Sequence, residues 1–579
     1  MTATLTPATA GGPGPAAATP RPALDAAIAE LGRRRDAWLA LSHEDRRALL
    51  ADLRRRFLTV APRWVEATRT LEGIAATGPF VGEEWLAGPY PVLRNIRLLE
   101  RTFADLAAGR VPEPPGPVTT RQGGRVVVRV FPTGVWDRAF FPGVTADVWM
   151  DPGVRLETLS ETQAVAYREG AGRGAVALVL GAGNVSSIGP MDTLHKLFTD
   201  RQVVLYKSHP VQDPVAPLYE EAFAAFIEAG WLRVVRGGAE VGAYLTDHPG
   251  IDEIHVTGSD RTYEAIVFGT GEEGAARKAA GRRRLTKRVT AELGNVSPVI
   301  VVPGPWSAGD VAYQGENIAS MLTNNAGFNC NAARIVVTHA EWARREDLLA
   351  AVRVVLAATP IRPAYYPGAA ERCDRVVAVH PEAELYGQRH EGELPWVFVP
   401  GLDPAAHDDP AFRVEAFCSL FGEAPIPAPS VARFVERAVE FCNRTLWGTL
   451  NVTLLVHPAS LRDAETATAV ERAVADLEYG TVSLNHWAAV GYAIASTPWG
   501  SYPGNEPTDI QSGVGWVHNP FLFDRPEKAV IRSPFRAWPK PPWFVSHKTA
   551  GSLAEDLTSF EAERSLASVP SILWHALRG

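Results

Sequence analysis

Ala175-Val-Ala-Leu-Val-Leu180 is the first of four short apolar runs that decide how this chain folds. The other three are Gln202-Val-Val-Leu-Tyr206, Trp231-Leu-Arg-Val-Val235 and Asp252-Glu-Ile-His-Val256, and longer stretches with a helical pattern separate them. Alternation of strands and helices predicts a parallel sheet with right-handed crossovers. Such sheets bind ligands at the carboxyl ends of their strands.

A second α/β series follows the first. Its strands are predicted at Val299-Ile-Val-Val302, Ala333–Val337, Leu394–Val399 and Thr449–Leu455. The strand end Val289-Thr-Ala-Glu-Leu-Gly294 joins the two series. We therefore expect a cleft between two α/β domains at this junction.

The N-terminal part of the chain lacks this alternation of strands and helices. Met1–Pro22 is rich in Ala, Pro, Thr and Gly and lacks the features of a secretory signal, so we expect a disordered leader. Ala23–Val60 has helical spacing, and Ser42 is a candidate helix cap. After the Pro/Gly-rich stretch Arg110–Gly124, the segment Arg125–Phe131 alternates like a strand.

Composition excludes several classes of function. The net charge of −8 and a pI near 6 argue against a nucleic-acid partner. No apolar run approaches the roughly 20 residues of a membrane-spanning helix, so we expect a soluble protein without a membrane partner. The four cysteines lack CxxC spacing, which argues against a disulfide framework or a metal site and fits the cytoplasm. They are Cys330, Cys373, Cys418 and Cys442, of which we expect the last three to be buried and unreactive.

Cys330 ends the Gly-containing segment Asn325-Ala-Gly-Phe-Asn-Cys330. A thiol is a nucleophile only as its thiolate. A carboxylate such as Glu292, on the joining strand, can activate water against a thioester. The pair indicates acyl-thioester chemistry.

From about Ala23 to about Asn519 the chain resembles the aldehyde dehydrogenase superfamily, because short blocks occur in that family's order. The blocks are Leu180-Gly-Ala-Gly-Asn184, Tyr206-Lys-Ser208, Gly238-Ala-Glu-Val-Gly242, Val256-Thr-Gly-Ser259, Glu292-Leu-Gly294, Cys330, Glu415-Ala-Phe417, Pro498-Trp-Gly500 and Ser512-Gly-Val-Gly515.

The resemblance implies an α/β fold of two parallel-sheet domains, one of them Rossmann-like, with a bridging β arm. The implied segments are a leader at 1–22, a cofactor-binding domain at 23–293 with an arm or insertion at about 120–173, a catalytic domain at 294–480, a return segment at 481–519 and a tail at 520–579 that serves as an oligomerisation arm. Because Arg125–Phe131 and the tail would expose strand edges, we expect a homodimer or homotetramer.

The resemblance also implies oxidation of an aldehyde to a carboxylic acid with NAD or NADP. Cys330 would be the nucleophile, Glu292 the base that activates water, and Asn184 a donor to the oxyanion. Cofactor contacts would come from Lys207, Gly238, Gly242, Ser259, Glu415 and Phe417.

Some positions depart from the family pattern. Phe328 replaces a glutamine, Asn295 a second glycine and Gly183 an aromatic residue. Pro210 replaces an acid that grips the adenosine ribose, so NADP is as compatible as NAD.

These departures leave two alternatives open. One is a CoA-acylating aldehyde dehydrogenase or acyl-CoA reductase on the same scaffold, and the other is a catalytically silent family member. The aromatic content of the chain hints at an apolar or aromatic aldehyde. We expect the aromatic residues of the insertion and tail to serve mainly in packing or subunit contacts.

Overall fold

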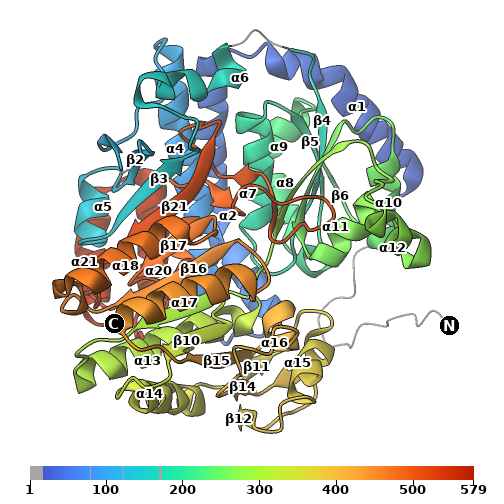
Figure 1. Cartoon of the computed structure of the whole chain (residues 1–579). Coiled ribbons are helices and arrows are strands. Elements are labelled where there is room, and N and C mark those ends of the chain that lie inside the picture. The colour runs from blue at the N-terminus through green and yellow to red at the C-terminus, as the bar shows by residue number, and fades with distance from the viewer. Residues whose placement is uncertain (1–16, 79, 122, 169–171) are drawn as a thin grey trace.

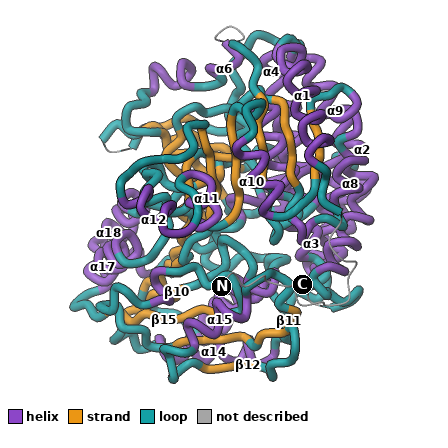
Figure 2. The backbone as a smooth tube through the Cα atoms, turned by 90° about the vertical axis from the view of Figure 1, so that its right-hand side faces the viewer, coloured by secondary structure: helices purple, strands orange, loops and turns teal. Residues whose placement is uncertain are grey.

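The computed structural model describes residues 17–78, 80–121, 123–168 and 172–579. Within this part of the chain, the strands form one six-stranded sheet, one eleven-stranded sheet and two two-stranded ribbons. Figure 1 shows the two large sheets as separate lobes covered by helices. In Figure 2 their strands form an upper and a lower group with loops between them. The predicted α/β architecture of two parallel-sheet lobes is confirmed.

The smaller sheet has the order β19-β8-β7-β4-β5-β6. Its members are β4 (Val176–Leu180), β5 (Val203–Lys207), β6 (Leu232–Val235), β7 (Glu253–Gly258), β8 (Arg288–Leu293) and β19 (Gly513–Val514). All pairs are parallel except that of β19 with β8. The four predicted apolar runs are therefore strands of one parallel sheet.

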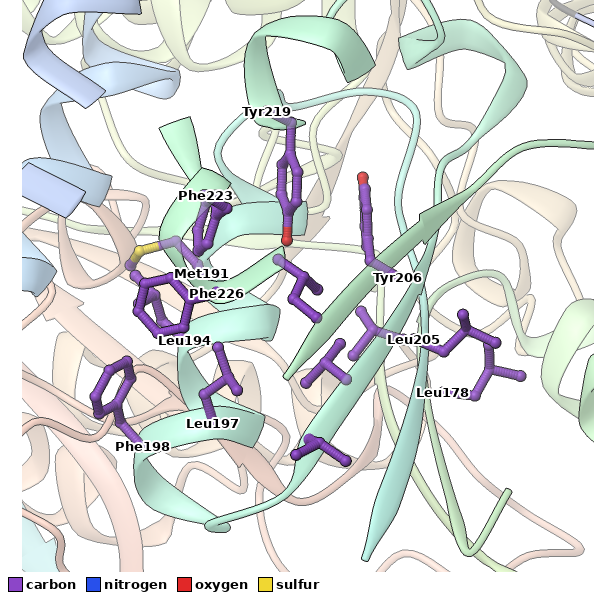
Figure 3. Packing of buried hydrophobic residues seen from close by; sticks show 14 of the residues in the cluster. Leu178, Met191, Leu194, Leu197, Phe198, Leu205, Tyr206, Tyr219, Phe223 and Phe226 are labelled. Carbon is purple, nitrogen blue, oxygen red and sulfur yellow. The ribbon is translucent and has the colours of Figure 1, made fainter. Parts of the chain in front are cut away.

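Apolar side chains from helices fill the core of this lobe. The helices are α1 (Arg21–Leu39), α2 (His43–Leu71), α7 (Ile188–Leu194) with the π-helical turn η2 (His195–Thr199), α8 (Ala216–Ala222), α9 (Ala224–Glu228), α10 (Ala239–Asp247) and α11 (Asp260–Val267), and α12 (Gly271–Ala279) follows α11. Figure 3 shows Met191 and Leu194 beside Phe223 and Phe226, all fully buried. Burial of this apolar surface stabilises the lobe.

The larger sheet has the order β1-β2-β3-β21-β17-β16-β9-β10-β15-β14-β12. Its strands are β1 (Val118–Thr120), β2 (Val126–Phe131), β3 (Thr145–Met150), β9 (Pro298–Val302), β10 (Ile335–His339), β12 (Glu384–Tyr386), β14 (Trp396–Val399), β15 (Leu420–Ile426), β16 (Asn451–Val456), β17 (Thr481–Leu484) and β21 (Pro526–Arg532). The central pairs are parallel, whereas β12 and the β1–β3 end pair antiparallel.

Both faces of this sheet are covered by helices. Alternate residues of a strand point to opposite faces, and accordingly Val299 and Val301 of β9 join one apolar cluster while Ile300 and Val302 join another. The first cluster contains α13 (Ala308–Thr323) and α14 (Arg345–Ala358), and the second contains α17 (Val431–Arg444) and α18 (Ala464–Asp476). Burial on both faces explains why these strands are almost continuously apolar.

The expectation of an exposed edge at Arg125–Phe131 is wrong. Strand β2 pairs with β1 on one side and with β3 on the other, all within the same chain. The tail also enters this sheet, because β21 lies between β17 and β3. These edges therefore require no partner subunit, and the homodimer or homotetramer stays a prediction, as do the domain boundaries.

The two ends of the chain pack beside each other. Helices α3 (Glu83–Ala87), α4 (Pro89–Ala107), α5 (Val135–Phe140), α20 (Ala550–Glu563) and α21 (Val569–Leu577) share apolar contacts. In Figure 1, α5 and α21 lie together at the left of the larger sheet. The tail is thus part of the folded body of this chain.

Near the N-terminus, the predicted helix cap is confirmed, and the predicted leader overlaps the first helix. Ser42 caps α2 through a capping box with Asp45. Residues 1–16 of the predicted leader lie outside the described residues, and α1 begins at Arg21, within that leader. None of the described helices is both long and apolar enough to cross a membrane.

Shorter elements complete the fold. They are α6 (Val165–Arg168), α15 (Ala369–Val377), α16 (Pro410–Arg413), α19 (Val490–Ala493), the ribbon of β11 (Arg362–Pro363) with β13 (Glu393–Leu394), and the ribbon of β18 (Trp499–Gly500) with β20 (Trp516–Val517).

Candidate active site

Cys330 lies on a loop between α13 and β10 that begins with a strained turn. Asn325 and Ala326 both have φ of 50°, in the left-handed region that costs free energy for residues with a Cβ. Hydrogen bonds hold the turn: the backbone N–H of Asn325 donates to Glu83 Oε2 (3.0 Å), and its side-chain amide donates to the carbonyl oxygen of Asn184 (2.8 Å). The loop is therefore fixed by segments distant in sequence.

Glu292 lies close to the thiol of Cys330: each side chain shifts the pKa of the other, and both line the same cavity. Glu292 lies near the end of β8, is 3% exposed, and accepts a hydrogen bond from Trp499 Nε1 (3.1 Å). Burial raises the pKa of Glu292 to about 8, and the nearby Asp192 carboxylate adds to the shift. Glu292 is therefore mostly protonated at neutral pH.

The surroundings also hold the Cys330 thiol in its protonated form. Burial and the carboxylates of Glu292 and Glu415 raise its pKa well above the ordinary value. The contact of Trp499 with Glu292 was not predicted. Trp499 lies within the block Pro498-Trp-Gly500 that contributes to the resemblance. Nothing in the sequence indicates which residue accepts the hydrogen bond of its indole N–H.

A cavity of about 110 Å³ opens in front of this pair. Its wall includes Cys330, Glu292, Asn329 and Asn331, and apolar residues of α3, α4, residues 487–494 and the tail. Trp487, Tyr492 and Trp543 in this wall were not singled out as site residues from the sequence. Cys330 and Glu292 thus face a space that a small molecule can enter.

Asn184 reaches the nucleophile loop from the end of β4. Its Nδ2 donates to the carbonyl oxygen of Phe328 (2.8 Å), two residues before Cys330. Its own carbonyl oxygen accepts from Tyr365 Oη (3.1 Å). The structure therefore brings Asn184 to the loop, although it is not among the residues that line the cavity.

Glu415 lies near Cys330, against the end of β8. A Cβ atom at Gly294 would be 2.0 Å from Glu415 Oε2, so only glycine permits this approach. The Asn295 backbone N–H donates to the carboxyl, and burial raises its pKa to about 7 although Arg334 and Arg372 oppose the shift. Glu415 Oε1 is buried without a hydrogen-bond partner among the described residues.

Phe328 belongs to an aromatic cluster that includes Phe417. Its ring lies 4.9 Å from that of Tyr365, 5.9 Å from Tyr366 and 6.0 Å from Phe417. The His209 ring stacks on Tyr366 at 5.8 Å, and Phe417 has a positive φ of 41°. Phe328, which stands where the family pattern has glutamine, is therefore a packing residue of this cluster.

The other departures also have structural roles. A Cβ at Gly183 would be 2.3 Å from His209 Nδ1, so the imidazole occupies the space of a side chain at 183. Asn295 joins two loops, because its Nδ2 donates to the carbonyl oxygen of Asn451 (3.0 Å) and its Oδ1 accepts from Ser297 Oγ (2.8 Å).

The remaining predicted cofactor residues gather at one edge of the smaller sheet. Lys207 ends β5, and burial lowers its pKa. Gly238 precedes α10, which contains Gly242, and both have open space where a Cβ would lie. Ser259 caps α11 by accepting from the Thr262 backbone N–H (3.2 Å). Parallel strands end at the same edge, so these positions adjoin one another.

Comparison with known proteins gives the following matches. A sequence profile described as "Aldehyde dehydrogenase family" matches residues 193–374. Retinal dehydrogenase 2 of Gallus gallus is 28% identical over 309 residues, which are 50% of this chain and 53% of that protein. The chain spans about half the length, or less, of the curated relatives it matches.

Solved structures match over a larger part of the chain. Staphylococcus aureus AldH in a substrate-bound state has a TM-score of 0.58 at 16% identity, covering 89% of this chain and 95% of that one. An NADP-dependent glyceraldehyde-3-phosphate dehydrogenase from Bacillus halodurans, complexed with NADP, has a TM-score of 0.57 at 17% identity, covering 88% and 91%. At such identities the likeness establishes the fold.

Proposed function

This chain belongs to the aldehyde dehydrogenase superfamily, and we propose that it oxidises an aldehyde to a carboxylic acid with NAD or NADP. The observation that carries the proposal is that Cys330 and Glu292 line one cavity and lie close enough for each to shift the pKa of the other. A nucleophile within hydrogen-bond reach of its base is the arrangement that covalent catalysis requires.

Glu292 performs two proton transfers in this mechanism. It first takes the proton of the Cys330 thiol, so that the thiolate adds to the aldehyde carbonyl and forms a thiohemiacetal. The oxyanion accepts hydrogen bonds from the Cys330 backbone N–H and from the second amide hydrogen of Asn184, whose first is given to Phe328. Glu292 then releases that proton to solvent, and after oxidation to a thioester the regenerated carboxylate takes a proton from the water that attacks the thioester, which releases the acid and the Cys330 thiolate.

The residues around Glu415 fit a nicotinamide cofactor. The buried, unpartnered Glu415 Oε1 is an acceptor suited to a ribose hydroxyl, and Phe417 lies two residues on. When bound, the cofactor supplies the hydride acceptor. Lys207 and the N–H groups after Ser259 would hold its adenosine ribose and pyrophosphate. Pro210, which adds no charge beside the ribose, leaves NAD and NADP both compatible.

Oxidation assays with and without coenzyme A test the proposal. The purified chain should reduce NAD or NADP with an aldehyde and release the free acid without coenzyme A. Cys330→Ser should abolish turnover while cofactor binding persists, and Glu292→Gln should give at most one turnover, since the thioester would not be hydrolysed. A product formed only with coenzyme A would support the acylating alternative. If iodoacetamide labels Cys330 no faster than a denatured-state thiol and no cofactor binds, the silent alternative holds.

A further inference from the structure

The cavity in front of Cys330 is walled mostly by apolar side chains from four separate parts of the chain. Leu86 comes from α3, Ile188 from α7, Tyr492 from α19, and Trp543 and Leu557 from the C-terminal tail. A wall of this kind favours the transfer of an apolar group out of water, by an amount that grows with the area buried.

The charges in the wall argue against an anionic substrate. Among the described residues the lining contains two carboxyl side chains, Glu83 and Glu292, and no Lys, Arg or His. Glu83 is already paired with Arg362 Nη1 (2.6 Å) and with the Asn325 backbone N–H. A substrate carboxylate or phosphate would therefore be buried without a counter-charge, which is strongly unfavourable.

The same groups offer little to a cationic substrate. The Glu83 carboxylate is occupied by Arg362, and Glu292 is mostly protonated near pH 7 because burial raises its pKa to about 8. Neither group is free to compensate a buried ammonium. An uncharged substrate therefore loses the least hydration free energy when it enters the cavity.

The size of the cavity limits the substrate to a compact group. Its volume is about 110 Å³, which is less than the roughly 150 Å³ of an apolar cavity that accepts a benzene ring, so one small ring is the upper limit for a group that enters it. The indole of Trp543 contributes to the wall and is held by the His486 ring at 4.6 Å and the Trp487 ring at 6.5 Å. Its position is thus set by aromatic packing.

We infer that the substrate is a compact uncharged aldehyde no larger than about benzaldehyde, and that Trp543 of the tail limits its length. This inference rests on the proposed aldehyde oxidation and specifies its substrate class. The tail would then supply a specificity-determining residue, in addition to closing the larger sheet with β21.

A matched set of aldehydes tests the charge. kcat/KM should be at least about 100-fold higher for benzaldehyde than for 4-carboxybenzaldehyde, which differs by one carboxylate. It should also exceed the value for 4-(trimethylammonio)benzaldehyde. Equal or higher values for either charged aldehyde would overturn the inference. Leu86→Arg adds a cation to the wall and should reduce the ratio of kcat/KM for benzaldehyde to that for 4-carboxybenzaldehyde about tenfold. Leu385→Arg, at an exposed position of β12, should leave this ratio unchanged.

Two tryptophan variants of the tail test the length limit. Trp543→Ala should raise kcat/KM for 4-butylbenzaldehyde about tenfold relative to benzaldehyde. Trp538→Ala is the matched control, because Trp538 is 74% exposed, is absent from the cavity wall and lies five residues earlier. An unchanged ratio in Trp543→Ala, or the same change in both variants, would overturn the role of Trp543. Circular dichroism and Tm establish that each variant is folded.

A binding measurement separates this inference from the proposed function. Isothermal titration calorimetry of Cys330→Ala should detect benzyl alcohol, which cannot be attacked, but not 4-(hydroxymethyl)benzoate. If this pattern holds while the unaltered chain oxidises no aldehyde, the dehydrogenase proposal fails and the class of ligand stands. If the benzoate binds at least as tightly, the inference about the cavity fails even when aldehyde oxidation is observed.

Discussion

Glu292 is held between two groups that act on its proton in opposite directions. The Asp192 carboxylate disfavours its ionised form, whereas the indole N–H of Trp499 donates to Oε1 and favours it. Because the base must be ionised to accept a proton, kcat/KM should rise with pH through an apparent pKa near 8. Since Glu292 and Cys330 each shift the pKa of the other, that value belongs to the pair.

Asp192→Asn should move this rising limb to lower pH, because it removes a negative charge near Glu292 without removing its bulk. Asp192 also accepts from Thr257 Oγ1 (2.9 Å), a bond that the asparagine carbonyl can keep. The measurement is kcat/KM from pH 5 to 10, followed by absorbance of the reduced cofactor. If the rising limb of the kcat/KM profile stays at the same pH in this variant, Asp192 does not influence the pKa of Glu292.

Trp499→Phe should shift the rising limb of kcat/KM to higher pH. It deletes the donor to Glu292 Oε1 while keeping an aromatic ring against Tyr492, 5.7 Å away. A hydrogen bond to a charged group contributes about 1.5–3 kcal/mol, so the rate at pH 7.5 should fall roughly ten- to hundredfold. Restoration of the rate at pH 10 would identify a shifted pKa, whereas a loss constant over the whole range would indicate damaged geometry.

At the scale of elements, the short helix α3 supports the nucleophile loop. Glu83 accepts from the backbone N–H of Asn325, the first left-handed residue of the turn, and pairs with Arg362 of β11. Three elements distant in sequence therefore meet at one carboxylate. Glu83 contacts neither Cys330 nor Glu292 in the described hydrogen bonds, so it acts as a positioning residue.

Glu83→Ala should lower kcat about ten- to hundredfold with little change in cofactor KM, because it leaves a buried N–H unsatisfied at a cost of about 1–3 kcal/mol. Glu83→Gln is the matched variant, since its amide oxygen can still accept from Asn325. The rate of Cys330 alkylation by iodoacetamide, measured against pH, reports on the loop directly. Equal profiles for the two variants would contradict this role.

The elements that could be predicted are those whose pattern is local. Strands β4, β5 and β9 are apolar runs bounded by turns, and Ser42 begins α2 with a recognisable cap. The pairing of β3 with β21 joins residues more than 370 positions apart, and no local pattern specifies it. For that reason the sequence did not reveal that β21 of the tail enters this sheet, whereas the edge expected at Arg125–Phe131 was wrong because β2 pairs with β1 and β3 on its two sides.

The candidate site divides in the same way. Cys330 and Glu292 could be paired from the chemistry of their side chains and the resemblance, and both line the same cavity, while their catalytic roles stay predictions. The partner of Trp499 and the place of Trp543 in the cavity wall depend on how distant segments pack. Such contacts are set by the tertiary structure, which periodicity does not encode.

At the scale of the whole molecule, one buried guanidinium joins the insertion, the tail and the wall of the cavity. Arg94 of α4 donates to Asp137 of α5 (2.7 and 3.0 Å), to Glu561 of α20 (2.6 Å) and to the carbonyl oxygen of Ile494 (2.7 Å). All three charged side chains are at most 5% exposed. Arg94 opposes the effect of burial and keeps the pKa of Asp137 and Glu561 below their ordinary values.

Arg94→Met should therefore destabilise the chain by about 3–5 kcal/mol at pH 7, because it leaves two buried carboxylates without this counter-charge. In the unaltered chain the depressed pKa values stabilise the fold above about pH 4, and this contribution is lost as the pH falls. In Arg94→Met the unpaired carboxyls favour protonation, so the deficit should shrink as the pH is lowered from 7 towards 4. Thermal unfolding followed across this range measures it. Arg97→Met is the control, because Arg97 is 20% exposed and, among the described residues, forms its ion pair with Glu561 alone. An equal loss of stability in both variants, or a deficit that does not depend on pH, would contradict a central role for Arg94.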